Sequence, residues 1–278
     1  MTPQSAETST TASKSNNILL QEAFDNGILR LTLNDAKRRN ALSDEMMETL
    51  SQALDKAAAD KTIRVLVLAA NGPAFCAGHD LKQIKAGRQA DDKGLAYFTK
   101  VFENCASLMI KIVQHPKPII AEVTGIATAA GCQLVASCDL AIAAKSSRFA
   151  TPGVHIGLFC STPMVALSRN VSNKQAMEML MAGDMVSAKK AAKIGLINEA
   201  VKDKKLTETT MALASKIASK STMTLAIGKQ AFYEQREMPL AEAYQYASDV
   251  MVQNILKQDA IEGIDAFVEK RKPQWTDQ

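Results

Sequence analysis

Several features are rare or absent in this sequence, and each absence excludes a class of site or protein. Only three histidines are present, and no two of the five cysteines form a Cys-x-x-Cys pair, so we expect no metal site. No stretch is long and apolar enough to span a bilayer, and no signal or arginine-rich transit segment is recognisable. The basic residues are scattered and the net charge is only +4, which argues against nucleic-acid binding. These absences predict a cytoplasmic protein that binds neither nucleic acid nor membrane.

The composition that is present suits a globular protein. Hydrophobic residues make up 47% of the 278 positions, enough for one domain with a large core. The odd number of cysteines, mostly in apolar segments, indicates reduced core thiols. Residues 1–16 are rich in Ser and Thr and contain no apolar run, so we expect a disordered tail there. The modest positive charge would favour an anionic small molecule as ligand.

Strand and helix patterns alternate in the first part of the chain. Alternating leucines predict a strand at 28–33, and mainly apolar runs predict buried strands at 63–69, 119–123 and 139–144. Between them, Ser43 can cap a helix, and 129–137 reads as a short apolar helix. Beyond about residue 173 the pattern is helical, at 175–182, 188–194, 206–219, 223–235 and 239–270. The sequence therefore predicts an α/β core over 17–200 and a helical C-terminal lobe over 201–278.

Two segments place backbone N–H groups just after predicted strands. The first is 75–81 (FCAGHDL), and the second is 125–132 (GIATAAGC), which leads into the helix at 129–137. Small residues in both allow a ligand to approach the backbone, and a helix N-terminus presents free N–H groups. Two such groups that converge on one point would polarise a carbonyl oxygen, as in an oxyanion hole.

Five ordered motifs together resemble the enoyl-CoA hydratase/isomerase (crotonase) family, from about residue 20 to 275. Residues 34–42 (NDAKRRNAL) look like the family segment N-R-P-x-x-x-N-A-L, and 75–81 are similar to A-F-x-A-G-x-D-L. The stretch 117–139 resembles the glycine-rich motif that ends in C-D, while 182–197 and 266–272 follow the later motifs. Within the family, AAGCQL, ATPGV and GLFCSTP resemble the group named for enoyl-CoA hydratase domain-containing protein 3.

The resemblance implies an α/β fold, a crotonase-type spiral of ββα units with a C-terminal helical trimerisation lobe. It implies an acyl-CoA ligand, no separate cofactor, and a homotrimer or a hexamer built as a dimer of trimers. The thioester oxygen would bind between the backbone N–H groups of His79 and Ala130. The other residues that the resemblance places near the ligand are Lys37, Arg38, Arg39, Ala77, Gly78, Asp80, Leu81, Gly131 and Lys270, the last with Lys272 reaching towards a neighbouring subunit.

The two glutamates that hydratases of this family use are both replaced. Gln133 stands in the glycine-rich motif where the family has G-C-E-L, and Gly153 follows Pro152 where the family has Q-P-E. Glutamine can orient a water but cannot take its proton, and each general acid or base contributes roughly 10²–10⁴-fold. We therefore expect a lyase of weak or altered 2-enoyl-CoA hydration activity, and expect Gln133→Glu combined with Gly153→Glu to raise it.

Several alternatives stay open at this point. The chain could be a non-catalytic acyl-CoA-binding or scaffold protein, or could catalyse another crotonase reaction such as isomerisation or thioester hydrolysis. RNA binding, known in one branch of the family, has little support from three basic residues at 37–39. A side chain could also replace the lost glutamates: His79 is the first candidate, His155 the second and Cys160 the third. We expect Asp80 to brace its turn, and His115 to be structural in a surface turn.

Overall fold

The structure, a computed structural model, describes residues 17–278 and contains two β-sheets. The predicted tail at 1–16 lies outside the described residues. The larger sheet has the order β1(Leu19–Ala23), β2(Ile28–Leu33), β3(Val65–Ala70), β5(Ile119–Val123), β7(Leu140–Ala144), β10(Glu199–Val201), with only β1 antiparallel to its neighbour. The smaller sheet has the order β4(Ala74–Cys76), β6(Ile126–Thr128), β8(Arg148–Ala150), β9(Val186–Ser187).

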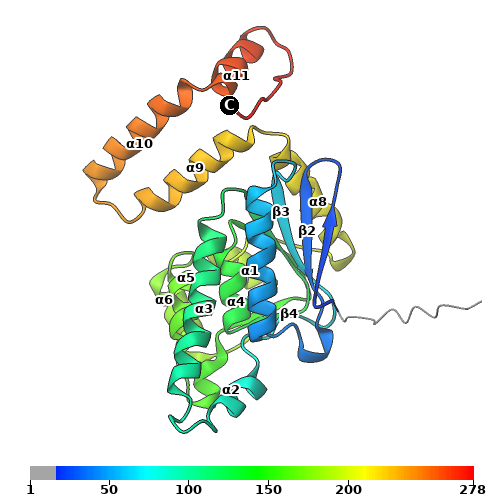
Figure 1. Cartoon of the computed structure of the whole chain (residues 1–278), viewed down its shortest axis with the longest axis vertical. Coiled ribbons are helices and arrows are strands. Elements are labelled where there is room, and N and C mark those ends of the chain that lie inside the picture. Colours follow the sequence, from blue (N-terminus) through cyan, green and yellow to red (C-terminus); the bar gives the residue numbers. More distant parts are fainter. Residues whose placement is uncertain (1–16) are drawn as a thin grey trace, which may run out of the picture.

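Helices cover both faces of the larger sheet (Figure 1). Leu66 and Leu68 of β3 belong to the core cluster that includes α1(Asp44–Ala59), whereas Val65 and Val67 pack with α8(Leu206–Ala218). Ser43 caps α1 as predicted, because its side chain accepts a hydrogen bond from Met46 N at 3.2 Å. The mainly apolar strand predicted at 63–69 is thus buried on both sides, since alternate side chains enter different cores.

The remaining core helices surround the smaller sheet. They are α2(Leu81–Gly87), α3(Leu95–Val113), α4(Ala130–Ser137), α5(Ser161–Ser168), α6(Asn173–Ala182) and α7(Ala188–Ile194), with short 3-10 turns η1(Ala36–Arg38), η2(Pro152–Ile156) and η3(Asp203–Lys205). No helix was predicted over the stretch that forms α3. Within residues 17–278, none of the helices is both long and apolar enough to cross a bilayer.

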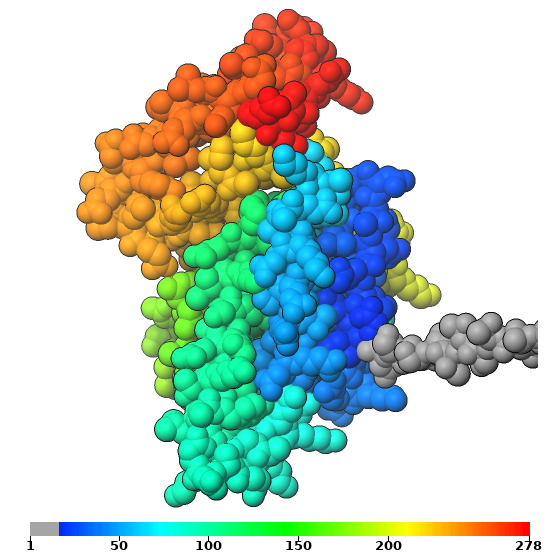
Figure 2. Space-filling model, viewed as in Figure 1, coloured from blue at the N-terminus to red at the C-terminus, as the bar shows by residue number. Residues whose placement is uncertain are grey.

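The last three helices project from the core as a separate lobe, seen in yellow to red in Figures 1 and 2. They are α9(Thr222–Gln235), α10(Leu240–Ile255) and α11(Gln258–Val268), so the predicted helical stretch 239–270 is two helices with a break at Leu256 and Lys257. No apolar side chain of α9 or α10 is buried. Large apolar side chains are exposed along the lobe, among them Phe232, Leu240, Tyr244, Met251, Val252, Ile264 and Phe267. α8 packs on the sheet, so the projecting part begins after it.

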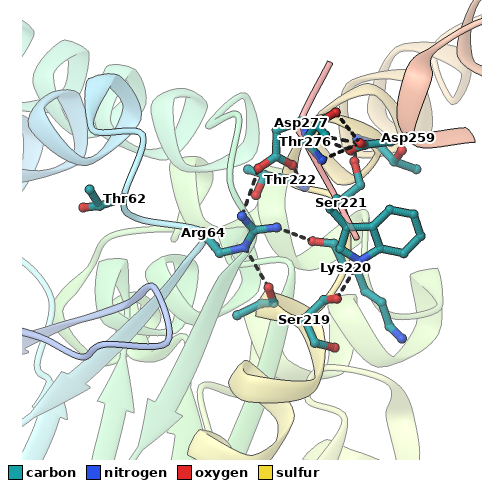
Figure 3. A network of polar contacts seen from close by, with 12 residues as sticks. Thr62, Arg64, Ser219, Lys220, Ser221, Thr222, Asp259, Thr276 and Asp277 are labelled. Carbon is teal, nitrogen blue, oxygen red and sulfur yellow. Dashed lines mark hydrogen bonds and ion pairs between the residues drawn. The ribbon is translucent and has the colours of Figure 1, made fainter. Parts of the chain in front are cut away.

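A polar network fastens the lobe to the edge of the core (Figure 3). Arg64, just before β3, donates to two backbone carbonyls at the end of α8 and pairs with Asp277 at 2.9 Å. The other oxygen of Asp277 accepts from the N–H of Thr222, the first residue of α9, at 2.6 Å. Asp259, the second residue of α11, accepts from the backbone N–H groups of Thr276 and Asp277 at 2.7 and 3.0 Å. The segment after α11 therefore returns to hold the start of α9.

Candidate active site

Three loops meet because they follow three neighbouring parallel strands. β4 pairs with β6, and β6 pairs with β8, all in the same direction. The residues that follow are Ala77–His79 after β4, Ala129 and Ala130 after β6, and Thr151–Gly153 after β8. The carboxyl ends of parallel strands share one edge of a sheet, which is where ligands bind in open α/β folds. The structure thus brings both predicted N–H segments, and the segment of the second missing glutamate, to one edge.

The two predicted N–H donors lie next to each other. A Cβ placed on Gly78 would lie 3.3 Å from the nitrogen of Ala130 and 3.1 Å from the carbonyl of Thr128, and Gly78 has φ +88°. Only glycine fits such a contact in the left-handed region. Within residues 17–278 no backbone carbonyl accepts from the N–H of His79. Ala130 is the first residue of α4, so its N–H has no acceptor within the helix. The geometry therefore provides two adjacent free donors.

The backbone before α4 is unusual. Ala129 has φ 50° and ψ −121°, a conformation that costs an alanine about 1–3 kcal/mol. Its N–H donates to the carbonyl of Ala150 on β8 at 2.9 Å, which holds the turn in place. A Cβ on Gly131 would lie 2.0 Å from the carbonyl oxygen of Cys76, so only glycine lets α4 start directly against β4. The strained turn thus brings the start of α4 against the end of β4.

Asn40 stabilises this edge of the sheet through its hydrogen bonds. From the sequence it was predicted only as part of the motif at 34–42. Its side-chain oxygen accepts from the N–H of Asp35 at 2.7 Å, and its amide nitrogen donates to the carbonyls of Asn71 and Ala74 at 2.8 Å each. The residue is fully buried and has φ 53°. Asparagine tolerates this conformation better than most residues. The one side chain therefore ties η1 to the entry of β4.

The imidazole of His79 is largely buried and unpartnered. Neither ring nitrogen has a hydrogen-bond partner among the described residues, and the ring meets the edge of Phe102 on α3 with centroids 5.5 Å apart. Burial lowers the pKa of the ring below its ordinary value of 6.5, opposed by smaller contributions from the backbone of Leu42 and the carboxylate of Asp44. The ring is therefore neutral at pH 7. Phe102 was not among the predicted site residues, because no helix was expected over its stretch of the chain.

Gln133 lies on α4 one turn beyond Ala130 and is 4% exposed. It lines a cavity of about 940 Å³ between α3, α4, α5 and α9, and its side-chain oxygen has no partner in the described part of the chain. The cavity wall also carries Asp139, which accepts from Lys229 at 2.8 Å and from Tyr233 at 3.1 Å. A cavity of this size is typical of small-molecule sites.

Gly153 leaves no room for any side chain. A Cβ there would lie 2.6 Å from the carbonyl oxygen of Leu158 and 2.9 Å from the sulfur of Cys160. The φ of Gly153 is not positive, so the obstacle is space and not backbone conformation. Our expectation that Gly153→Glu would help restore hydration is therefore wrong, because the loop that follows occupies the place of the side chain.

The basic residues at 37–39 differ in how they are engaged. Arg38 contacts Asp35, and lies 3.5 Å from Glu45 and 3.8 Å from Asp80. Lys37 and Arg39 are exposed, and within residues 17–278 no carboxylate pairs with either.

Arg39 also reaches the site through its backbone, since its carbonyl accepts from the N–H of Ala77 at 3.1 Å. Lys270 follows α11, at the opposite end of the molecule from α2 in Figure 1. Within one chain it therefore does not join the other predicted residues.

Asp80 and Leu81 mark the start of α2. The carboxylate of Asp80 accepts from the N–H groups of Lys82 and Gln83, so it caps the helix, as we expected of a bracing residue. Leu81 is 58% exposed beside it.

The other candidate side chains are engaged elsewhere. His155 bonds the carbonyl of Ala182 at 2.9 Å, and His115 bonds the carbonyls of Lys117 and Leu54. His115 is structural as predicted, but it is buried and not in a surface turn. Burial raises the pKa of the Cys160 thiol, which disfavours the thiolate that a nucleophile requires.

Known proteins match this chain over nearly its whole described length. The profile of the enoyl-CoA hydratase/isomerase family matches residues 23–278. Enoyl-CoA hydratase domain-containing protein 3, mitochondrial, from Mus musculus is 47% identical over 250 residues, covering 90% of this chain and 82% of the relative. The Homo sapiens protein of the same name is 46% identical over 250 residues, covering 90% and 81%.

Solved structures agree. An enoyl-CoA hydratase from Mycobacterium smegmatis superposes with a TM-score of 0.88 at 47% identity, over 93% of this chain and 98% of that one. Human enoyl-CoA hydratase domain-containing protein 3 gives a TM-score of 0.88 at 44% identity, over 93% and 100%. The crotonase fold and the resemblance to that group are thus confirmed.

The comparisons also correct one prediction. The relatives from Mus musculus, Rattus norvegicus and Homo sapiens are named mitochondrial, so the cytoplasmic location inferred from the sequence is wrong. That inference relied on the absence of a recognisable targeting segment, and such segments are defined by composition more than by motif. On its sequence, its fold and the loops at the ends of β4, β6 and β8, the chain belongs to the enoyl-CoA hydratase/isomerase family.

Proposed function

We propose that this protein binds acyl-CoA thioesters in mitochondria, with the thioester oxygen held between the N–H groups of His79 and Ala130. The observation that carries the proposal is the adjacency of these two free donors at the ends of β4 and β6. Donors fixed in this way stabilise the negative charge that an enolate places on the thioester oxygen. The exposed Lys37 and Arg39 stand near the same edge and suit the phosphates of CoA.

The acyl group would enter the cavity that Gln133 lines. α4 starts at Ala130 and its next turn presents Gln133, so a thioester bound at the helix start has its acyl carbons beside that side chain. The cavity continues along α3 and α9 and has room for more than a short chain. No separate cofactor is required for this binding, since the donors are backbone groups.

We propose that hydration of 2-enoyl-CoA is weak. Gln133 can orient a water but cannot accept its proton, and Gly153 excludes a side chain altogether. The space taken by Leu158 and Cys160 also favours the second candidate function, a non-catalytic acyl-CoA-binding protein. The two candidates share the binding step and differ in turnover.

Calorimetry with butyryl-CoA and crotonyl-CoA tests the binding step. We expect micromolar affinity for both, and a several-fold loss for Lys37→Ala combined with Arg39→Ala, with Lys189→Ala as the matched control on α7. Absence of heat and of thermal stabilisation with either thioester would refute the proposed function. A crotonyl-CoA hydration assay then separates the candidates, since a rate of hundreds per second would contradict our interpretation of positions 133 and 153.

A further inference from the structure

The three histidines of this chain differ in their hydrogen bonding. Both ring nitrogens of His115 bond backbone carbonyls, and Nε2 of His155 bonds the carbonyl of Ala182. Within residues 17–278 neither nitrogen of His79 has a partner, and both are buried. A buried polar atom left unpaired costs about 1–3 kcal/mol, so an unpaired ring at a ligand-binding edge calls for an explanation.

The surroundings of the His79 ring suit a group that gains and loses a proton. The one charged group that acts on it is Asp44, at the start of α1, whose carboxylate also accepts from the hydroxyl of Tyr97 on α3 at 3.4 Å. A nearby carboxylate stabilises an imidazolium once it forms, while burial keeps the resting ring neutral. Phe102 packs nearly perpendicular to the ring and is itself 41% exposed.

The ring also adjoins the path of the acyl group. Phe102 lies seven residues before Met109 on α3, which places both on the same face of that helix. Met109 and Val113 line the same cavity as Gln133. The face of α3 that contacts His79 is therefore the face that lines the cavity.

We propose that the imidazole of His79 is the base that moves the proton at Cα of the bound acyl thioester. This rests on the proposed binding of the thioester oxygen by the N–H of the same residue. In the forward step the Cα–H bond breaks, its electron pair moves into the Cα–carbonyl bond, and the carbonyl electrons move onto the oxygen between His79 and Ala130. The proton forms a bond to the free ring nitrogen. In the reverse step the imidazolium returns a proton to Cα, or a deuteron once its N–H has exchanged with D₂O, and no oxidant or second substrate is consumed.

The test uses butyryl-CoA in D₂O, because a saturated thioester can exchange its Cα protons but cannot be hydrated. Mass spectrometry of recovered butyryl-CoA measures deuterium incorporation, and calorimetry measures affinity in parallel. We expect the wild type to incorporate deuterium at a rate that falls as pD drops, since a protonated ring cannot accept a proton. His79→Phe keeps the backbone N–H and an aromatic ring against Phe102, so affinity should change less than about threefold while exchange falls roughly 10²–10⁴-fold.

Two further variants complete the design. His79→Ala leaves a space that free imidazole can enter, so added imidazole should restore part of the exchange. His155→Phe is the matched control, since it removes a histidine that bonds only Ala182, and its exchange should equal that of the wild type. Binding without exchange in the wild type, or undiminished exchange in both His79 variants, would overturn this inference and leave the proposed binding intact. Absence of binding would refute the proposed function and this inference with it.

Discussion

Ala129 occupies a backbone conformation that favours glycine, directly before the donor at Ala130. Its φ of 50° with ψ −121° costs an alanine about 1–3 kcal/mol, whereas glycine adds only about 0.4–1 kcal/mol of unfolded-state entropy. We therefore expect Ala129→Gly to raise the free energy of unfolding by about 1 kcal/mol in urea titrations. Ala136→Gly, in the interior of α4, is the control and should lower it by about 1 kcal/mol. If Ala129→Gly destabilises the protein, the conformation described for this turn is incorrect.

Gly153 should tolerate no larger residue. We expect Gly153→Ala to lower the free energy of unfolding by about 1–3 kcal/mol, because its Cβ would press on the carbonyl of Leu158 and the sulfur of Cys160. Adding Cys160→Ala should recover part of this loss by removing one of the two contacts.

Gly157→Ala is not a suitable control, since Gly157 has φ +74°. Gly228→Ala is suitable, since no atom lies within 4 Å of its Cβ position, and it should be neutral or stabilising. If Gly153→Ala is as stable as the wild type, position 153 has room for a side chain, and the glutamate variant becomes feasible again.

The helix α9 is attached to the core through a buried charge pair. Lys229 donates to Asp139 at 2.8 Å and to the carbonyls of Ile112 and Lys117, and its side chain is only 8% exposed. Lys229→Met should lower the free energy of unfolding by about 3 kcal/mol, because it leaves the carboxylate of Asp139 without its cation. Tyr233→Phe should cost only about 1 kcal/mol.

The double variant Lys229→Met with Asp139→Asn distinguishes the contribution of the ion pair from that of the other contacts of Lys229. If the loss comes from the unpaired carboxylate, the double variant should be more stable than Lys229→Met alone. Additive losses would show that the contribution of Lys229 is mainly its contact with the two carbonyls.

The elements that the sequence predicted are those with a strong repeating pattern. The strands at 28–33 and 119–123 and the helix at 188–194 match the structure at both ends, because each has either a clear period or a continuous apolar run. α3 was not assigned, although its buried residues Val101, Cys105, Leu108 and Ile112 follow a helical spacing that could have revealed it.

The site itself was only partly predictable. Its donors were identified from motifs, but β4, β6 and β8 have three residues each, too few to show a period. Their pairing joins segments about 20 to 50 residues apart, which no local pattern encodes. For the same reason, the sequence could not show that Leu158 and Cys160 close the space at Gly153.

At the scale of the whole molecule, the lobe exposes more apolar surface than a monomer usually does. Leu240, Leu256, Phe267 and Val268 are each more than 70% exposed, and they lie on or beside α10 and α11. Contiguous exposed apolar surface marks an interface, and copies of one chain usually close into a symmetric assembly. We expect light scattering to report a trimer or hexamer at micromolar concentration.

The thermal midpoint should then rise with protein concentration, because association stabilises the folded chain by mass action. Phe267→Glu combined with Leu256→Glu should shift the assembly towards monomer, whereas Lys216→Glu, on α8, should not. A stable monomer with a midpoint independent of concentration would contradict the assembly.

The two donors at the ends of β4 and β6 are insensitive to most mutations at their own positions. Because they are backbone groups, a mutation at codon 79 or 130 leaves the N–H in place unless it encodes proline, the one residue without it. The side chains around them are not constrained in this way, and at positions 133 and 153 this chain departs from the family motif. A change of side chains could therefore remove or exchange the chemistry while the proposed binding of a thioester oxygen by the two N–H groups is kept.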